Sequence, residues 1–406
     1  MFSFKVRFAT CFFSFFLTFF PYLASAKTSD KTVILVSIDG MRWDYIKRHK
    51  ASYLSSLAET GFSAEKLQPI FPSKTFPNHY TIVTGLYAEE HGIVGNHFYD
   101  GQREESFLLK KRSAVEDGSW YGGEPIWITA KKQGLRTACF FWPGSEAAIM
   151  GMRPDIYKVY DESITQKERV DRVLSWLEKK DRPHFITLYF SKVDSMGHKY
   201  GPLSSETAKA VEKVDGMLKR LHKGVEKRGL ADKVDLVVVS DHGMAQTSKD
   251  RVIDFASFFD SSQFSKTLFS STMMMLWPKD AKKPLYKKSA FFDVYPRKAI
   301  PARYRFQKNH RISPYVAIAR PGYVFRKEGS KKKKLLAGTH GYDNRHPDMA
   351  GILIGHGPSF KRQKIGVAEN IDIYNLLSHL LAIKPAKNSG SNKLVGLVKK
   401  QNDMRL

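Results

Sequence analysis

The chain has 406 residues, of which 42% are hydrophobic and 26% are charged. These fractions match ordinary globular proteins and exclude a wholly disordered chain, and the lack of a second long apolar run after the N-terminus excludes a protein with several membrane spans. The net charge of +26, from 66 Lys and Arg against 40 Asp and Glu, favours anionic partners, although surface lysines that only improve solubility explain it equally well.

The N-terminus has the pattern of a secretory signal peptide. Lys5 and Arg7 precede an apolar stretch at residues 8–20, which the small residues 24–26 follow. The stretch is too short to cross a membrane comfortably, so an uncleaved anchor is the less favoured alternative. We therefore expect cleavage near Ala26 and export to the periplasm or the medium, with a net charge of +24 once Lys5 and Arg7 are removed.

Cysteine usage excludes an intrachain disulfide in the mature chain. Cys11 lies within the signal peptide, so only Cys139 remains after cleavage. An exported protein without disulfides favours a bacterial periplasmic setting over an animal extracellular one. Cys139 lies in an apolar run and is predicted to be a buried thiol.

Apolar, β-branched runs alternate with helical patterns along the chain. Strands are predicted at Thr32–Ile38 and at residues 137–142, 184–190, 234–240 and 349–354, and helices at residues 125–133, 205–228 and 371–383. Continuous apolar strands between amphipathic helices indicate an α/β sandwich with a mostly parallel central sheet flanked by helices. We expect residues 27–406 to form one catalytic domain after the signal peptide 1–26.

The region from about residue 250 to 330 has a different character. It is rich in Lys, Phe and Met and has no long helical pattern, so it is predicted to be a small insertion subdomain. The three methionines at residues 273–275 are interpreted as core residues rather than a cofactor-binding motif. The lysine run at residues 331–334 is expected to be a solvated loop.

Three of the predicted strands end at carboxylates. Asp39, Asp194 and Asp241 follow the strands at Thr32–Ile38, 184–190 and 234–240. A single aspartate in such a place is usually a turn former or a helix cap. Because ligands bind at the carboxyl ends of parallel strands, three such aspartates predict a shared site.

Histidines accompany these carboxylates. His198 comes four residues after Asp194, His242 directly follows Asp241, and His340 lies in a glycine-containing loop. Mixed carboxylate and imidazole ligands suit Zn²⁺, and six ligands fit two sites of three better than one tetrahedral site. Two metals can hold both the attacking and the leaving oxygen of a phosphoryl transfer. The remaining histidines, such as His79, His91 and His97, are not assigned to metal.

Thr75 is the candidate nucleophile. It lies between Pro72 and Pro77, which restrict the backbone and hold the hydroxyl in one orientation. Without the metal ligands this segment would be interpreted as a proline-rich turn. Beside a divalent metal, a threonine hydroxyl acquires a lower pKa and becomes a usable nucleophile.

The segment at residues 72–95, followed by Asn96, strongly resembles the nucleotide pyrophosphatase/phosphodiesterase family of the alkaline phosphatase superfamily. The other family signatures occur in the same order, and the resemblance extends from about residue 32 to residue 383. These signatures are Asp39-Gly40, Asp194-x-x-Gly-His198, Asp241-His242-Gly243 and Gly338-x-His340-Gly-Tyr-Asp-Asn344. Because the Cys-rich modules of animal members are missing, the chain resembles the bacterial type with a stand-alone catalytic domain.

The resemblance implies specific roles. One zinc ion would be bound by Asp194, His198 and His340, and the other by Asp39, Asp241 and His242. Thr75 would be activated by the second zinc and form a phospho-threonine intermediate, which water then hydrolyses. Asn96 would donate a hydrogen bond to a phosphate oxygen, and the backbone amide of Phe76 is expected to assist it.

The resemblance also implies an aromatic substrate pocket. Phe76 and Tyr160 would stack on the base of a nucleotide, and Tyr189 would flank the leaving nucleoside; ordinary core packing is the alternative for all three. No arginine near Thr75 matches the clamp of the monoester-cleaving enzymes, since Arg42 and Arg103 are candidates in sequence only. This pattern favours phosphodiesters over monoesters.

The favoured prediction is a two-zinc phosphodiesterase that releases nucleoside 5′-monophosphate from small nucleotide substrates. One alternative keeps the same metals but takes lysophospholipid or glycerophosphocholine diesters, whose choline group would contact the aromatic residues by cation–π interaction. A phosphomonoesterase of the same superfamily is another. A secreted polyanion-binding protein is the non-enzyme alternative, although such a protein has no need of a nucleophile. No specific nucleic-acid partner is predicted.

Overall fold

The protein is described from a computed structural model. The described residues are 1–3, 30–280, 285, 287–327 and 335–399. Most of the predicted signal peptide, with Cys11, and the lysine run 331–334 lie outside them. Among the described residues, no helix has both the length and the apolar character that crossing a membrane requires.

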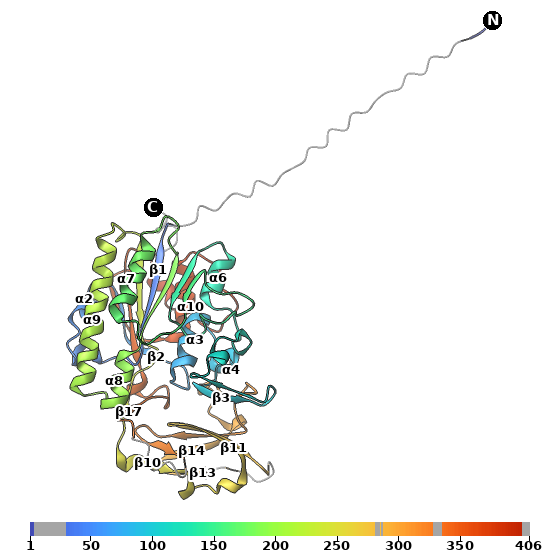
Figure 1. The fold of residues 1–406 in the computed structure, drawn as a ribbon, viewed down its shortest axis with the longest axis vertical. Coiled ribbons are helices and arrows are strands. Elements are labelled where there is room, and N and C mark those ends of the chain that lie inside the picture. Colours follow the sequence, from blue (N-terminus) through green and yellow to red (C-terminus); the bar gives the residue numbers. More distant parts are fainter. Residues whose placement is uncertain (4–29, 281–284, 286, 328–334, 400–406) are drawn as a thin grey trace.

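The core of the fold is an eight-stranded sheet (Figure 1). Every neighbouring pair of strands is parallel except the two pairs that involve β18, so the predicted fold class is confirmed. The strand order across the sheet is β19 (Gln363–Glu369), β2 (Phe62–Gln68), β18 (Gly351–His356), β8 (Val234–Val239), β1 (Thr32–Ile38), β7 (Phe185–Phe190), β5 (Thr137–Phe140) and β6 (Ile156–Lys158).

Helices cover both faces of this sheet. Alternate residues of β1 point to opposite sides, so Ile34 and Val36 belong to one hydrophobic cluster and Val33 and Leu35 to the other. The first face packs against α1 (Tyr45–Arg48), α2 (Ser52–Thr60), α7 (Gln166–Leu177), α8 (Lys192–Tyr200) and α9 (Ser205–Glu226). The second packs against α3 (Thr75–Thr84), α4 (Ala88–His91), α5 (Arg112–Val115), α6 (Ile126–Lys132) and α10 (Ile373–Leu380).

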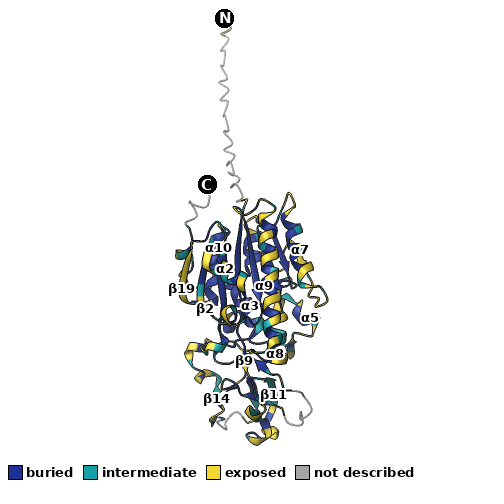
Figure 2. Cartoon of the chain, turned by 90° about the vertical axis from the view of Figure 1, so that its left-hand side faces the viewer, coloured by how far each residue is buried: buried dark blue, intermediate teal, exposed yellow. Residues whose placement is uncertain are grey.

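Burial explains why the apolar runs predicted the strands well. Every residue of β1, β7 and β8 is buried, because helices shield both faces of the sheet there. Helix α9 instead alternates between buried and exposed sides (Figure 2). The last predicted strand begins two residues later than expected, because Pro347–Met349 forms a short 3₁₀ helix before β18. Cys139 is fully buried in β5, as predicted.

A second, antiparallel sheet lies beyond the carboxyl ends of the parallel strands (Figure 1). Met274 is buried in the cluster of this sheet, whereas Met273 and Met275 are buried in a cluster of the main sheet, so the predicted core role of these residues is confirmed. The strand order is β11 (Phe264–Ser270), β12 (Met273–Pro278), β15 (Tyr315–Ala319), β14 (Phe292–Pro296) and β13 (Lys287–Lys288).

A buried ion pair connects the segment between β14 and β15 of the second sheet to the strand β3 (His97–Asp100). The carboxylate of Asp100, at the end of β3, is 1% exposed and accepts a hydrogen bond of 2.8 Å from Arg311. Arg311 also donates to the backbone carbonyls of Gly92 and Trp120. Burial alone would raise the pKa of Asp100, but hydrogen bonds from Arg311 and His310 lower it to about 2.

Replacing Arg311 should therefore destabilise the protein. We expect Arg311→Met to reduce the free energy of unfolding at pH 7 by about 3 kcal/mol, because it leaves the buried Asp100 carboxylate without its main partner. Urea denaturation measures the change. The contribution of Asp100 is present above its ordinary pKa of 3.8 and is lost as the pH falls through about 2, so the gap between wild type and variant should narrow in acid. An equal gap at every pH would contradict this assignment.

Candidate metal centre and substrate pocket

The three predicted carboxylates meet where β8, β1 and β7 end. Asp39 directly follows β1, and Asp241 lies just beyond the end of β8. Asp194 lies in the first turn of α8. The backbone N–H of Asp194 donates to the carbonyl of Asp39 at 3.0 Å. A Cβ atom at Gly40, which has a φ of +69°, would lie 2.9 Å from the Cα of Asp194, so only glycine allows this close approach.

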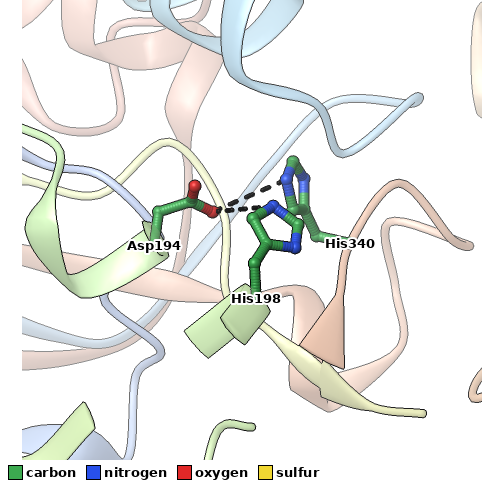
Figure 3. A group of neighbouring side chains, drawn as sticks. All are labelled: Asp194, His198 and His340. Carbon is green, nitrogen blue, oxygen red and sulfur yellow. Dashed lines mark ion pairs between the residues drawn. The ribbon is translucent and has the colours of Figure 1, made fainter. Parts of the chain in front are cut away.

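Two groups of three ligand-type side chains form at this edge, each with its donor atoms within 4.8 Å of one another. The first consists of Asp194, His198 and His340 (Figure 3). Asp194 and His198 lie one turn apart on α8, and His340 follows the short strand β17 (Gly338–Thr339). Asp194 Oδ1 lies 3.4 Å from Nε2 of His198 and 3.6 Å from Nε2 of His340.

The second group consists of Asp39, Asp241 and His242. Nε2 of His242 lies 3.0 Å from Asp241 Oδ2 and 3.5 Å from Asp39 Oδ1. The two groups adjoin, because the rings of His242 and His340 stack with centroids 3.5 Å apart. Thr75 Oγ1 lies 3.3 Å from Nε2 of His242. The structure thus brings all six predicted ligands and the predicted nucleophile together.

The histidines are oriented for metal binding. Each ring lies within hydrogen-bond distance of a backbone carbonyl through Nδ1: His198 with Gly338 at 2.8 Å, His242 with Gly243 at 2.9 Å and His340 with Ser73 at 2.7 Å. A carbonyl can only accept, so Nδ1 carries the proton and Nε2 presents a lone pair toward the carboxylates. This second hydrogen bond is the usual way in which proteins fix metal-binding imidazoles.

The carboxylates supply matching donors. Asp39 Oδ1, Asp194 Oδ1 and Asp241 Oδ2 are buried and accept no hydrogen bond from the described residues. They lie 3.0–3.6 Å from the Nε2 atoms. Two ligands of a tetrahedral Zn²⁺, each about 2.0–2.1 Å from the ion, lie about 3.3 Å apart. The chemistry and spacing of both groups therefore fit a divalent cation such as zinc.

The pKa shifts of these residues also favour a bound cation. Burial and the neighbouring carboxylates of Asp241 and Asp194 raise the pKa of Asp39 well above its ordinary value. Burial opposes ionisation of Asp241 too, but the nearby His242 and His79 hold its pKa below the ordinary value. Burial, assisted by His242 and Lys74, lowers the pKa of His340. Burial opposes protonation of His242 as well, but the adjacent Asp241 raises the pKa of this histidine. Carboxylates this crowded would be neutralised by bound divalent cations.

A cavity of about 400 Å³ opens onto this centre. Its size is within the range of small-molecule sites. Thr75 reaches it from the first turn of α3, where the helix N-terminus favours anionic groups. The cavity is also lined by the other predicted substrate residues Phe76, Asn96, Tyr160 and Tyr189, and by Asp39, Asp194, His198 and His340.

The structure changes the expected role of the Phe76 amide. This N–H group donates to Asn96 Oδ1 at 2.9 Å, so Asn96 rather than substrate is its partner. The bond fixes the Asn96 carboxamide through its oxygen and leaves the Nδ2 group as a donor toward substrate. The ring of Phe76 packs against Phe107 at a centroid distance of 5.7 Å.

The two predicted tyrosines differ from each other. Tyr160 is 38% exposed and packs edge-on against Phe141 and Tyr189 at centroid distances of 5.1 and 6.2 Å, so part of its ring is free to contact a ligand. Tyr189 is nearly buried, and its hydroxyl donates to Asp39 Oδ2 at 2.6 Å. Tyr189 therefore orients a candidate metal ligand in addition to lining the cavity.

Sequence reasoning missed His79. This buried residue lies one turn after Thr75 on α3, and its Nδ1 is 2.9 Å from the carbonyl of Thr75 and 3.2 Å from Asp241 Oδ2. Its Nε2 lies 2.8 Å from the hydroxyl of Ser37. His79 thus links the nucleophile segment to a candidate metal ligand. Its spacing of four residues from Thr75, which places both residues on one side of a helix, is the sequence signal that could have identified it.

Neither of the two arginines that the sequence offered as phosphate-binding candidates lies at the cavity. Arg42 and Arg103 do not line the cavity: Arg42 pairs with Asp44 and Asp348, and Arg103 with Asp117. Arg112, which the sequence analysis did not consider, does line it, together with its ion-pair partner Glu146.

Comparison with known proteins identifies relatives that match most of the chain. Residues 33–343 match the family model described as Type I phosphodiesterase / nucleotide pyrophosphatase. Ectonucleotide pyrophosphatase/phosphodiesterase family member 1 of Homo sapiens is 38% identical over 378 residues, which cover 88% of this chain and 41% of that protein. Venom phosphodiesterase CdcPDE of Crotalus durissus collilineatus is 38% identical, with 89% and 45% covered. The chain thus spans less than half the length of these relatives.

A solved structure of the same family also matches this chain. An inactive variant of murine ectonucleotide pyrophosphatase/phosphodiesterase 5, in which alanine replaces a threonine, has been solved in complex with AMP. It superposes on this chain with a TM-score of 0.86 and 33% sequence identity, covering 91% of this chain and 100% of that one.

The hydrogen bond from Tyr189 to Asp39 can be tested by metal binding. We expect Tyr189→Phe to weaken zinc binding by about 10- to 100-fold, because partners that orient a ligand typically have effects of this size. Zinc competition with a chromophoric chelator measures the affinity. Tyr160→Phe is the matched control, since the Tyr160 hydroxyl only reaches Ser191 at 3.4 Å, and it should leave the affinity unchanged. Equal affinities of the Tyr189 variant and wild type would contradict the assignment.

Proposed function

The chain belongs to the type I phosphodiesterase/nucleotide pyrophosphatase family, and on that basis we propose that it is a two-zinc phosphodiesterase. Its substrates are small nucleotides, in which it hydrolyses phosphodiester and pyrophosphate bonds and releases nucleoside 5′-monophosphate. The observation that carries the proposal is the Thr75 hydroxyl, which lies 3.3 Å from His242 beside both donor groups at the wall of the cavity. The murine relative has been solved in complex with AMP, which supports a nucleotide as the ligand.

The ligand groups divide the metal centre into two sites. Asp194, His198 and His340 would hold one ion; the other site consists of Asp39, Asp241 and His242. Bound zinc ions would lower the pKa of the threonine hydroxyl and offset the negative charge of the phosphate.

The reaction has two displacements. Thr75 Oγ loses its proton to solvent and forms a bond to phosphorus, while the bond from phosphorus to the leaving oxygen breaks. The leaving group departs with the bonding electron pair and takes up a proton from solvent, and a phospho-threonine remains. Water then attacks the phosphorus and the bond to Thr75 Oγ breaks. The hydroxyl of the water stays on phosphorus in the released nucleoside 5′-monophosphate, and its other proton restores the Thr75 hydroxyl. The inactive murine variant, which lacks a threonine, supports a threonine nucleophile in this family.

Other residues of the cavity bind and orient the substrate. Asn96 Nδ2 donates a hydrogen bond to a non-bridging phosphate oxygen, and the α3 N-terminus favours the phosphate electrostatically. Phe76 and Tyr160 provide ring surfaces for the base.

The proposal assigns the activity to residues 27–406, with the region 250–330 as an inserted subdomain. It also places the enzyme in the periplasm or the medium, after removal of the predicted signal peptide. No specific nucleic-acid partner is part of the proposal.

Replacing the nucleophile tests the covalent mechanism. We expect Thr75→Ala to lower kcat for bis-p-nitrophenyl phosphate by at least about 10³-fold, because no hydroxyl remains to attack phosphorus. Thr75→Ser keeps a hydroxyl and should retain part of the activity. Brief acid quenching of wild type with labelled substrate should trap label on the peptide that contains Thr75. Unchanged turnover of the alanine variant would contradict the mechanism.

A substrate panel separates nucleotides from lipid-derived diesters. The zinc-loaded protein should hydrolyse ATP or a nucleotide sugar with a higher kcat/KM than glycerophosphocholine, with products identified by mass. Phe76→Ala should raise KM for the nucleotides through lost stacking, with less effect on glycerophosphocholine. A tenfold preference for the choline ester, equal to about 1.4 kcal/mol in the barrier, would overturn the nucleotide assignment in favour of the lipid alternative.

A further inference from the structure

Lys74 is a buried cation that the proposed reaction does not use. It directly precedes the nucleophile, and its side chain is 5% exposed. An ammonium group removed from water is costly unless polar partners replace its hydration. Lys74 Nζ donates to the backbone carbonyl of His340 at 2.6 Å and to Ser271 Oγ at 3.4 Å. The lysine therefore joins the nucleophile segment, the His340 loop and the second sheet.

The contacts with the second sheet come from the tip of one hairpin. Ser271 and Thr272 connect β11 to β12, and Thr272 is fully buried. Thr272 Oγ1 donates to the same carbonyl of His340 at 3.3 Å, and Ser271 Oγ lies 3.2 Å from Thr339 Oγ1. The carbonyl of His340 thus accepts hydrogen bonds from two separate parts of the molecule.

Gly341 makes room for this arrangement. It has a φ of +106°, and a Cβ atom there would lie 2.2 Å from Cε of Lys74. Any other residue would displace the lysine or strain the backbone. The glycine that follows His340 in the sequence motif is therefore explained by the packing of Lys74.

We propose that Lys74 and the hairpin tip Ser271–Thr272 form a clamp that positions His340 within the group Asp194, His198 and His340. The clamp holds the backbone of His340, and the bond from Nδ1 to the Ser73 carbonyl holds its ring, so the direction of Nε2 is fixed at both ends. These are positioning residues, and the second sheet thereby contributes to one of the two metal sites. The inference rests on the proposed zinc centre.

Metal retention in clamp variants tests this proposal. The variants are Lys74→Met, Lys74→Arg and Ser271→Ala/Thr272→Val, with Thr267→Val on the same hairpin as the matched control. Zinc per chain is measured by mass spectrometry after dialysis against chelators of increasing strength, and apo-protein melting is recorded in parallel. Wild type and Thr267→Val should hold two zinc ions of high affinity.

Lys74→Met and the double variant should each lower the affinity for one zinc ion by about 10-fold or more and leave the affinity for the other unchanged. Lys74→Arg should restore most of the loss, because it keeps a donor cation. For these variants kcat should fall more than KM rises, while apo melting of the double variant stays near wild type. If Lys74→Met does not fold, the double variant, which keeps Lys74, carries the same test.

The outcomes separate this inference from the proposed function. A wild type that binds no zinc would overturn the proposed function itself. A wild type that holds two zinc ions, with clamp variants that hold both equally well, would overturn only the clamp. An equal loss of affinity for both zinc ions would also contradict the clamp, because it contacts a single ligand group.

Discussion

Three buried carboxylates converge where neighbouring strands end, and much of the surrounding structure serves to hold them there. Burial and the carboxylates of Asp241 and Asp194 raise the pKa of Asp39, and each of the three aspartates has one buried oxygen that accepts no hydrogen bond from the described residues. Such an arrangement is unfavourable in a dry environment unless positive charge compensates it. Divalent cations held by these oxygens and by the three imidazoles would remove that conflict, which supports the proposed metal centre on physical grounds.

The topology of the fold produces this convergence. Parallel pairing of β8, β1 and β7 brings their carboxyl ends to one edge, so residues about 150 to 200 positions apart meet without any local sequence relationship. Helix α3, on one face of the sheet, brings Thr75 to the same edge, and α8, on the other, brings Asp194 and His198. The second sheet lies beyond these ends and contacts the His340 loop through one hairpin tip.

The sequence allowed prediction wherever a local pattern carried the information. Continuous apolar runs located β1, β7 and β8 because these strands are buried on both faces, and the aspartates just after them indicated the site. The partners that hold the site were not predictable in this way. The hydroxyl of Tyr189 on Asp39, the ring of His79 beside Asp241 and the ammonium of Lys74 on the His340 carbonyl all depend on tertiary approach. The antiparallel direction of β18 is likewise not encoded in its apolar pattern, which is the same for either strand direction.

The most direct test of this account is the location of bound metal in crystals of the mature protein grown with zinc. Anomalous difference maps at the zinc absorption edge should show two peaks, one enclosed by Asp194, His198 and His340 and the other by Asp39, Asp241 and His242, both beside the Thr75 hydroxyl. A single peak shared by both groups, or peaks only at surface histidines away from Thr75, would contradict it.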